Sequence, residues 1–510
     1  MNASQERVLV ANGRAVPLDA LPDLSPDRFR EAVAGAVAAG ERLAALVAGP
    51  ADPDGLHRLL AVLADDARGA LALVSTRVGR AYPALTPLCT QAHLFEREIL
   101  ESWGIVPEGH PWLKPVRHPL RRLDGTVVSP WTVPGVLDPW TLAGEDVHEV
   151  AVGPVHAGVI EPGHFRFQCH GEQVFHLEIA LGFQHRGVER ALLGLPSPRT
   201  LAILETLSGD TTVGHGTAGA QVLEGLAGVD PSPRAWRIRA LALEWERLAC
   251  HTGDLGALAG DVGYLPTSAW CGRLRGDWLN LTALLCGSRF GRGLIRPGGV
   301  RFDLDPDRCR EATRRMQATM QDVEGAVGLL FGTPSVLARF EHTGTVSRED
   351  ARALGLVGPC ARASGLPRDV RQDHPTGAWI GLGCRAAVQQ SGDVLARARV
   401  RWDEIRDSAA RCQAWLDELA GTPPEALLPP GISGRPLARR SLVVSLVEGW
   451  RGEILHLATT DEAGRIDQWK VVDPSFRNWQ GLSLALRGGE ISDFPLCNKS
   501  FNLSYCGFDL

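Results

Sequence analysis

The sequence predicts an α+β protein, with a small N-terminal α/β domain followed by a large, mainly α-helical domain that contains small β-sheet regions. Three observations predict this class. Long segments with apolar residues at helical spacing fill much of the chain after residue 186, alternating segments flank them on both sides, and a proline-rich segment precedes them. The 510 residues are enough for two to four domains with sizeable cores.

The first part of the chain mixes the two kinds of pattern. Residues 28–49 carry apolar residues at helical spacing and predict an amphipathic helix, and the mixed pattern continues after them. The later segment "TVVSPWTVPGVLDPW" has three prolines and little periodicity, which indicates a linker. We therefore place the first domain at 1–125, the linker at 126–146 and the second domain at 147–510.

The second domain begins and ends with strand patterns. Residues 148–183 alternate apolar and polar residues around a Gly-Glu turn, which is typical of antiparallel strands. Three long amphipathic helices are predicted next, at 234–260, 309–331 and 391–421. The tail, 441–510, returns to short alternating segments and predicts further strands.

The composition is that of an ordinary soluble globular protein. The chain is 44% hydrophobic and 22% charged, with a formal net charge of -6. It has no basic footprint for nucleic acid and no polybasic run for an anionic membrane surface. No apolar stretch is long enough to span a membrane, and the first residues do not resemble a signal peptide, so we expect a cytoplasmic location.

The eleven cysteines are scattered, and no two of them have C-x-x-C spacing. We interpret them as reduced thiols that act as small apolar residues.

Polar residues concentrate with small ones in a few segments. These are "GFQHRGVER" (182–190), "LETLSGDTTVGHGTAG" (204–219), "EGWRGEILH" (448–456) and "DPSFRNW" (473–479). Small residues allow close approach to the backbone, and buried Glu and His can move protons. Helix caps and surface ion pairs would explain any one segment alone.

Taken together and in order, the segments resemble the large subunit of membrane-bound [NiFe] hydrogenases of the formate hydrogenlyase type, and the 49-kDa protein of respiratory complex I. The segment "FEREILESWGIVPEGHP" (95–111) is similar to the signature of the 30-kDa protein of complex I. The resemblance covers about residues 90 to 510 and implies those two folds for the two predicted domains. The matching motifs are "GPVH" (153–156), "HRGVE" (185–189), "RPGGVR" (296–301), "GLVGPCARASGLPRDVR" (355–371), "SGDVLARARVRWDE" (391–404) and "RGEILH" (451–456).

In the hydrogenases two C-x-x-C motifs hold nickel and iron. The resemblance places their four ligand positions at Ser208, Thr211, Ser475 and Asn478. None of these is a thiol, and neutral hydroxyls and amides are poor ligands for a soft transition-metal cluster. We therefore expect no metal ligands here and no hydrogen chemistry.

A hard-cation site built from Asp210, His215 and Asp473 is a third possibility, since oxygen ligands suit magnesium.

The resemblance also suggests which residues move protons. The Glu of the hydrogenase R-G-x-E motif transfers protons and matches Glu189, and His215 is a second candidate for proton transfer. An ion pair of Glu189 with Arg186 or Arg190 is an equally weighted alternative. Asp393 and Arg397 are expected to form an i,i+4 helix pair.

Glu244, Arg247 and His251 share a helix face and are expected to connect their helix to a neighbour.

Complex I offers a second precedent, because its cavity lacks the metal cluster and receives a quinone head group. The His and Tyr that serve there fall on Ile160 and Gly209, which cannot bond a quinone through a side chain. His156, His164 or His215 could replace them, and Arg451 is expected to line the cavity.

We expect an electron-transfer subunit of a complex I-like or formate hydrogenlyase-like membrane complex, with a quinone or an unknown small molecule as the acceptor. No cofactor is expected on this chain. Iron–sulfur clusters would lie in a partner similar to the iron–sulfur small (B-type) subunit of complex I, and NADH, if used, would bind elsewhere in the complex. Membrane-embedded proteins, antiporter-like and similar to the H-type subunit of complex I, would hold the chain on the inner face of the cell membrane.

A non-catalytic structural subunit is the alternative. The aromatic C-terminal tail is expected to pack on its own domain or to enter a neighbouring subunit.

Overall fold

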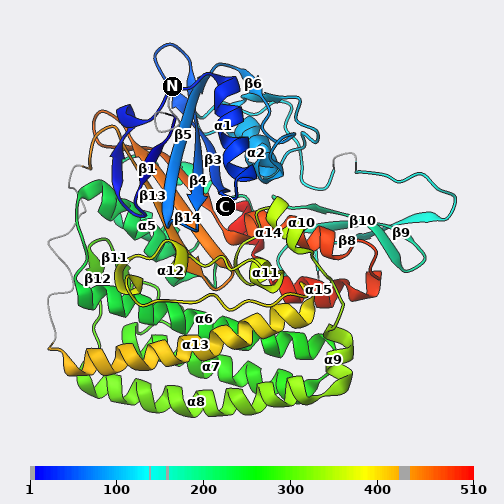
Figure 1. Ribbon diagram of the computed structural model, residues 1–510, viewed down its shortest axis with the longest axis vertical. Coiled ribbons are helices and arrows are strands. Elements are labelled where there is room, and N and C mark those ends of the chain that lie inside the picture. Colours follow the sequence, from blue (N-terminus) through cyan, green and yellow to red (C-terminus); the bar gives the residue numbers. More distant parts are fainter. Residues whose placement is uncertain (1–5, 137–138, 157–159, 424–436) are drawn as a thin grey trace.

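The structure, a computed structural model, describes residues 6–136, 139–156, 160–423 and 437–510. Three layers follow one another in Figure 1: the N-terminal sheet with its helices, a second sheet flanked by short helices, and a layer of long helices. Several separate sheets combined with many helices confirm the α+β class. No helix among the described residues is long and apolar enough to cross a membrane.

A four-stranded antiparallel sheet organises the N-terminal part. Its order is β1-β5-β4-β3, and helices α1 and α2 pack against it. Ser25 caps α1 and Pro26 occupies its first position, so the local sequence fixes where this helix begins. The bounds are Val8–Val10 for β1, Arg42–Ala51 for β3, His57–Asp65 for β4, Ala70–Val78 for β5, Pro26–Ala38 for α1 and His93–Trp103 for α2; β6 (Ala81–Pro83) and β7 (Val106–Glu108) form a separate parallel pair.

The helix predicted over 28–49 is wrong in its second half, because α1 ends at Ala38 and β3 begins at Arg42. Gly40 lies between them with a φ of +113°, a conformation that side chains other than glycine rarely adopt. Every residue of β3 from Arg42 to Gly49 is buried. A strand buried on both faces is continuously apolar, and periodicity cannot distinguish such a run from a buried helix.

The second sheet contains strands from the N-terminal and the C-terminal parts of the chain. Its order is β15-β14-β13-β2, and β2 comes from the first residues of the chain. Arg42 of β3 reaches Glu453 of β14 with hydrogen bonds of 2.8 and 2.5 Å, so a buried ion pair connects the two sheets. The domain limits at 125 and 147 stay a prediction. The bounds are Ala15–Pro17 for β2, Ser441–Gly449 for β13, Gly452–Thr460 for β14 and Ile466–Val472 for β15.

A third sheet confirms the antiparallel strands predicted over 148–183. It consists of β8 (Val147–Val152), β9 (His164–His170) and β10 (Gln173–Ala180), with β9 in the middle. It projects at the right of Figure 1.

Long helices form the layer at the bottom of Figure 1 and confirm the three predicted ones. They are α6 (Pro233–Asp261), α7 (Leu265–Cys286), α8 (Pro306–Gly332) and α13 (Val394–Gly421). Shorter helices connect the layers: α3 (Val188–Ala191), α4 (Pro198–Leu204), α5 (Thr212–Ala227), α9 (Pro334–Phe340), α10 (Arg348–Ala353), α11 (Gly358–Ala363) and α12 (Val370–Asp373); β11 (Ile295–Arg296) and β12 (Gly299–Val300) form a small hairpin.

The expected helix pair between Asp393 and Arg397 is wrong. Asp393 is the N-cap of α13, and its carboxylate accepts from the Ala396 amide at 2.8 Å. Arg397 instead donates to the Ser500 hydroxyl at 2.9 Å. The side chain of an N-cap residue accepts hydrogen bonds from the free N–H groups of the first helical turn. It is therefore not available to a side chain one turn later.

The tail is only partly as predicted. Strands β13–β15 are confirmed, but the residues after Val472 form helices α14 (Pro474–Ala485), α15 (Phe494–Phe501) and α16 (Tyr505–Asp509). Asp473 caps α14 and Pro474 follows at its first position, a helix-start signal that the alternating pattern concealed. Leu510 is 1% exposed, so the aromatic tail packs on its own chain.

Gly358, at the start of α11, meets the turn between β13 and β14. Its φ is +66°, and an added Cβ would lie within 2.1 Å of the Arg451 carbonyl oxygen. Only glycine permits this approach.

We predict that Gly358→Ala lowers the free energy of unfolding by more than about 2 kcal/mol, since overpacking adds to backbone strain. Gly171→Ala is the control, because Gly171 has a φ of +57° but nothing within 4 Å of an added Cβ. Urea unfolding compares the two variants. Equal losses would show that the contact with Arg451 contributes nothing.

Candidate functional site

Four side chains stand where the resemblance places metal ligands, and the structure brings them together at the starts of two helices. Ser208 precedes α5 and Thr211 is its N-cap, while Ser475 and Asn478 lie at the start of α14. All four are at most 1% exposed. The turn between β13 and β14 adds Arg451, whose guanidinium donates to Thr211 at 3.3 Å.

Protein groups satisfy each of these side chains. The Ser208 hydroxyl lies 2.9 Å from that of Ser504, and the Ser504 amide donates to the Ser475 hydroxyl at 2.8 Å. The Asn478 amide bonds the backbone N–H and carbonyl of Val357, each at 3.1 Å. The buried polar groups therefore need no additional ligand.

The ion pair between Arg451 and Asp210 is the centre of this site. Its two hydrogen bonds measure 2.6 and 2.8 Å, and the guanidinium also lies over the Trp450 ring at 3.9 Å. Burial opposes ionisation of Asp210, but the charge and hydrogen bonds of Arg451 outweigh it and hold the pKa of this carboxyl below its ordinary value. Such a forked, charge-assisted pair is strong and fixes the geometry.

The residues present do not fit a nickel–iron cluster. No group of three or more His, Cys, Asp or Glu that could hold a metal ion occurs in the described ranges. The thiols near the site are Cys250, 3.7 Å from the Asp210 carbonyl, and Cys506, 3.5 Å from the Ser504 hydroxyl. Burial raises the pKa of both thiols, whereas metal binding requires the thiolate. The Asp210 carboxylate binds Arg451, and among the residues that the structure describes, Asp210, His215 and Asp473 do not form a group that could hold magnesium.

His215 belongs to a buried chain of hydrogen bonds that reaches three elements. The Trp469 indole N–H lies 3.3 Å from Nδ1 of His456, whose Nε2 is 3.1 Å from Nδ1 of His215. Nε2 of His215 is 3.0 Å from the Asp473 carboxylate. Trp469 can only donate, so the neutral tautomers follow in one direction toward Asp473. Burial and then the neighbouring His215 hold the pKa of His456 well below its ordinary value.

Glu189 is buried and pairs with Lys470, not with Arg186 or Arg190. Its carboxylate lies 3.0 Å from Nζ of Lys470 and accepts from the Val471 amide at 2.9 Å. The alternative of an ion pair with Arg186 or Arg190 is therefore wrong, because the partner comes from strand β15, far away in the sequence. Burial opposes ionisation, but Lys470 and then Arg117 hold the pKa of Glu189 below its ordinary value. Burial lowers the pKa of Lys470 to about 8.

Glu189 also lines a cavity of about 520 Å³ between the N-terminal part and the segment 182–190.

The other histidines proposed from the sequence have local partners. Nε2 of His156 lies 2.8 Å from the Gly163 carbonyl, and Nδ1 of His164 lies 3.4 Å from the Gly153 carbonyl. No hydrogen bond or ion pair in the described part of the chain joins them to Arg451. The structure thus unites His215 and Arg451 with the four ligand positions, and leaves His156, His164 and Glu189 outside that set.

The site reaches the surface at Gly209 and Asp210. The Asp210 side chain is 31% exposed, and an added Cβ on Gly209 would meet nothing within 4 Å. Ile160 is partly buried. Sequence reasoning missed His456 and Ser504, although His456 is the last residue of the "RGEILH" motif.

Comparisons with known proteins agree with this architecture. The family "Respiratory-chain NADH dehydrogenase, 49 Kd subunit" matches residues 261–428, and the family "Respiratory-chain NADH dehydrogenase, 30 Kd subunit" matches residues 52–125. Formate hydrogenlyase subunit 5 of Escherichia coli (strain K12) is 30% identical over 441 residues, which cover 83% of this chain and 76% of that protein. The C/D subunit of the NADH-quinone oxidoreductase of Bacteroides thetaiotaomicron is 28% identical, with 73% and 74% covered.

A solved structure shares the fold. It belongs to the membrane-bound sulfane sulfur reductase, an archaeal respiratory membrane complex, and superposes with a TM-score of 0.65 at 23% sequence identity. The match covers 72% of this chain and 100% of that one.

We predict unequal losses when the Arg451–Asp210 pair is broken. Asp210→Asn leaves a guanidinium whose side chain is only 6% exposed without its hydrogen-bonded counter-charge, so the free energy of unfolding should fall by about 3 kcal/mol or more. Arg451→Met should cost less, because Asp210 reaches water. The double variant should lose less than the sum of the two.

Urea unfolding provides these free energies. Arg237→Met is the control, since this arginine pairs with Glu418 at the surface and should change stability by less than about 1 kcal/mol. Additive losses in the double variant would contradict the coupling.

Proposed function

The chain belongs to the family of [NiFe]-hydrogenase large subunits and respiratory-chain NADH dehydrogenase 49 Kd subunits, and we propose that it is an electron-transfer subunit of a membrane-associated oxidoreductase complex without a nickel–iron centre. The Arg451–Asp210 ion pair carries the proposal, because it lies with Ser208 and Thr211 where thiolate ligands would be needed. The chain is then not an active hydrogenase.

Electrons would reach this chain from iron–sulfur clusters in a partner similar to the iron–sulfur small subunit of complex I. The absence of any C-x-x-C pair from the sequence supports placing those clusters in another protein of the complex. We propose a quinone as the acceptor, bound outside the ion pair at the edge formed by Gly209 and Asp210. The open space beside Gly209 and the partial exposure of Asp210 support this place.

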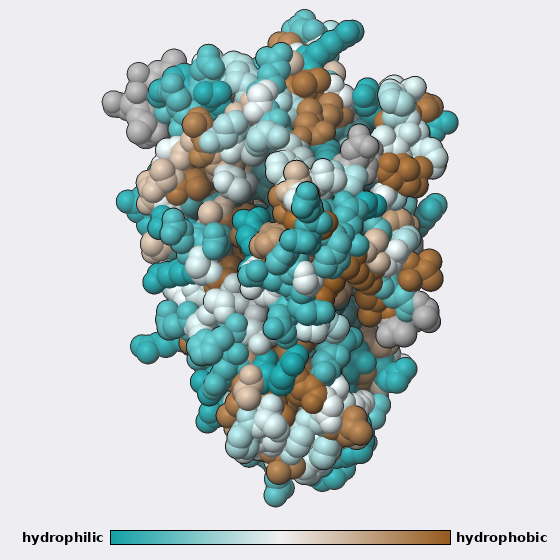
Figure 2. Space-filling view, turned by 90° about the vertical axis from the view of Figure 1, so that its right-hand side faces the viewer, coloured by the Kyte–Doolittle hydropathy of each residue, from teal (hydrophilic) through white to brown (hydrophobic). Residues whose placement is uncertain are grey.

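Membrane-embedded partners, antiporter-like and similar to the H-type subunit of complex I, would hold the chain at the inner face of the cell membrane. Apolar side chains before the third sheet and directly after its first strand support a docking surface there. Trp131 is 54% exposed, Trp140 55%, Val136 77% and Val155 81%. Figure 2 faces this side of the molecule and shows apolar residues among polar ones.

A non-catalytic structural subunit is the second candidate, and one observation favours it. None of the four side chains at the ligand positions lines one of the main cavities of the described structure. A site that is closed by its own hydrogen bonds can be retained for the fold alone.

Purification of the complex through a tag on this chain tests the proposal. Electron paramagnetic resonance first shows that the partner's iron–sulfur clusters are reduced. We expect these clusters to be reoxidised when a quinone is added. Reduced clusters that transfer no electrons to any quinone would contradict the electron-transfer function and favour the structural subunit.

We predict that Glu189→Gln and His215→Gln lower the quinone reduction rate at least tenfold while the complex still assembles. The physical reason is that groups which transfer protons contribute about 10²–10⁴-fold to rates. Glu311→Gln, on the exposed face of α8, is the matched control. Normal assembly with unchanged rates in both variants would mean that the site is vestigial.

A further inference from the structure

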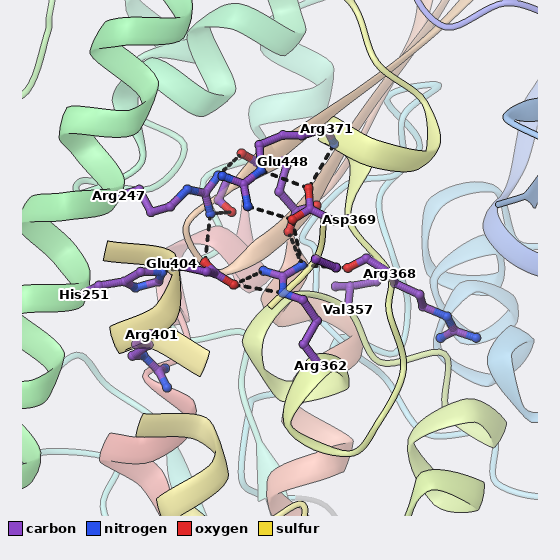
Figure 3. A network of polar contacts seen from close by, with 12 residues as sticks. Arg247, His251, Val357, Arg362, Arg368, Asp369, Arg371, Arg401, Glu404 and Glu448 are labelled. Carbon is purple, nitrogen blue, oxygen red and sulfur yellow. Dashed lines mark hydrogen bonds and ion pairs between the residues drawn. The ribbon is translucent and has the colours of Figure 1, made fainter. Parts of the chain in front are cut away.

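Eight ionisable side chains meet in the interior where α6, α13, residues 362–371 and β13 come together (Figure 3). We call them the interior charge cluster. None is more than 5% exposed. The members are Glu244, Arg247, His251, Arg362, Asp369, Arg371, Glu404 and Glu448.

Glu404 of α13 holds the cluster together. Its carboxylate lies 2.7 Å from Arg362, 2.8 Å from His251 and 3.4 Å from Arg247. Contacts from His251 and Arg247 to α13 confirm the expectation that this face of α6 is connected to a neighbour. Arg247 also donates to the backbone carbonyls of Glu448 and Gly449, at 2.7 and 3.0 Å.

The charges of the cluster do not balance when every carboxyl is ionised. Three guanidinium groups face four carboxylates, and burial lowers the pKa of His251 despite its bond to Glu404, which favours the neutral imidazole at neutral pH. Glu448 and Asp369 share one guanidinium nitrogen of Arg362, at 2.8 and 3.7 Å. One proton on this pair of carboxylates would restore neutrality.

The excess negative charge of the cluster falls on Glu448. Burial and then the charge of Asp369 raise the pKa of Glu448 to about 7. Burial also opposes ionisation of Asp369, but Arg371 and Arg362 hold its pKa below the ordinary value. In addition to Arg362, the Val370 amide donates to the Glu448 carboxyl, at 3.0 Å.

Two charged groups near the cluster are paired, whereas Asp373, which accepts from the Asp369 amide at 3.0 Å, has no ion pair among the described residues, and burial raises its pKa to about 6. Glu453, opposite Glu448 on β14, is bound by Arg42, and Arg401 is bound by Asp254 at 2.6 Å. Arg368 contributes only its carbonyl, which accepts from Arg362, and Figure 3 shows its side chain directed away. These groups leave the imbalance at Glu448 in place.

A small cavity beside Glu448 adjoins a groove at the surface, and we call the two together the passage. A cavity of about 30 Å³, lined by Glu448, Arg371 and Gln221, has room for water. It shares Gln221, Trp236 and Thr376 with a surface groove of about 760 Å³. Gln221 donates to the Thr376 hydroxyl at 2.9 Å, so both cavities have polar side chains in a lining that is otherwise mostly apolar.

We propose that the interior charge cluster is a proton-binding site, in which Glu448 takes up and releases one proton through this passage. The proton moves from water in the passage to a carboxylate oxygen of Glu448, where an O–H bond forms, and it returns by the same route. No other bond changes.

The proposal goes beyond the electron-transfer function and does not depend on it. Glu448 precedes Arg451 by three residues on the same hairpin, so the proton changes the charge close to the Arg451–Asp210 pair.

Infrared difference spectroscopy of the full chain between pH 5.5 and 8.5 tests the proposal. As the pH falls, the wild type should gain the infrared signal of a protonated carboxyl with a midpoint near pH 7. Glu448→Gln should lack this signal. Glu246→Gln is the matched control, because burial raises the pKa of Glu246 to about 8 and this residue lies outside the cluster. A signal near pH 7 that persists in Glu448→Gln would overturn the assignment.

Asp369→Asn keeps the proposal testable even if Glu448→Gln does not fold. Removing the like charge should shift the midpoint of Glu448 down by at least one pH unit, and an unchanged midpoint would overturn the pairing. Ala378→Trp narrows the passage at a residue that both cavities share. It should slow deuterium exchange of the carboxyl at least tenfold, and unchanged exchange would overturn the route.

Stability provides an independent check. A carboxyl whose pKa is raised by folding binds its proton more tightly in the folded state, so stability is lost as pH rises from about 4.5 to about 7. Relative to Glu448→Gln, the unfolding equilibrium constant of the wild type should rise on the order of 100-fold across this window. The same pH dependence in both proteins would contradict the proposal.

Discussion

The half-buried ion pair between Arg451 and Asp210 is the interaction on which this account depends. A guanidinium in the interior needs a counter-charge, and Asp210 supplies it from the loop before α5. Because the pair also accepts or donates bonds to Ser208 and Thr211, it fixes the start of α5 against the β13–β14 turn. The close approach of Gly358 holds the other side of the same turn.

One hairpin brings the buried polar groups of the large domain together. The β13–β14 hairpin carries Glu448 on β13, Arg451 in the turn and His456 on β14, and each belongs to a different set of contacts. Glu448 faces the interior charge cluster, Arg451 faces the ligand positions, and His456 leads through His215 to Asp473. Charge at one of these groups therefore acts on the others through a short, rigid element.

The sequence patterns predicted the long helices and the antiparallel sheets, because an amphipathic helix or a half-buried strand has a visible period. They failed at β3, where burial on both faces removes the period, and after Val472, where a helix start followed a strand. The motifs singled out Ser208 and Ser475, which the structure brings together through Ser504.

The sequence could not predict which charged side chains pair with one another. Glu189 bonds Lys470 across 281 positions, and the arginines beside it in the sequence point elsewhere. Arg186, for example, donates to the Thr206 carbonyl at 2.9 Å. Contacts of this kind depend on which elements the fold places side by side, and no local spacing encodes them.

The metal content of the protein is the most direct test of the central claim. Nickel and iron per chain can be measured by elemental analysis after purification from the natural host, with a nickel protein of that host as the control. The account predicts no nickel in this chain. Nickel near one atom per chain would contradict it, because hydroxyl and amide groups at the four positions would then be holding a metal centre.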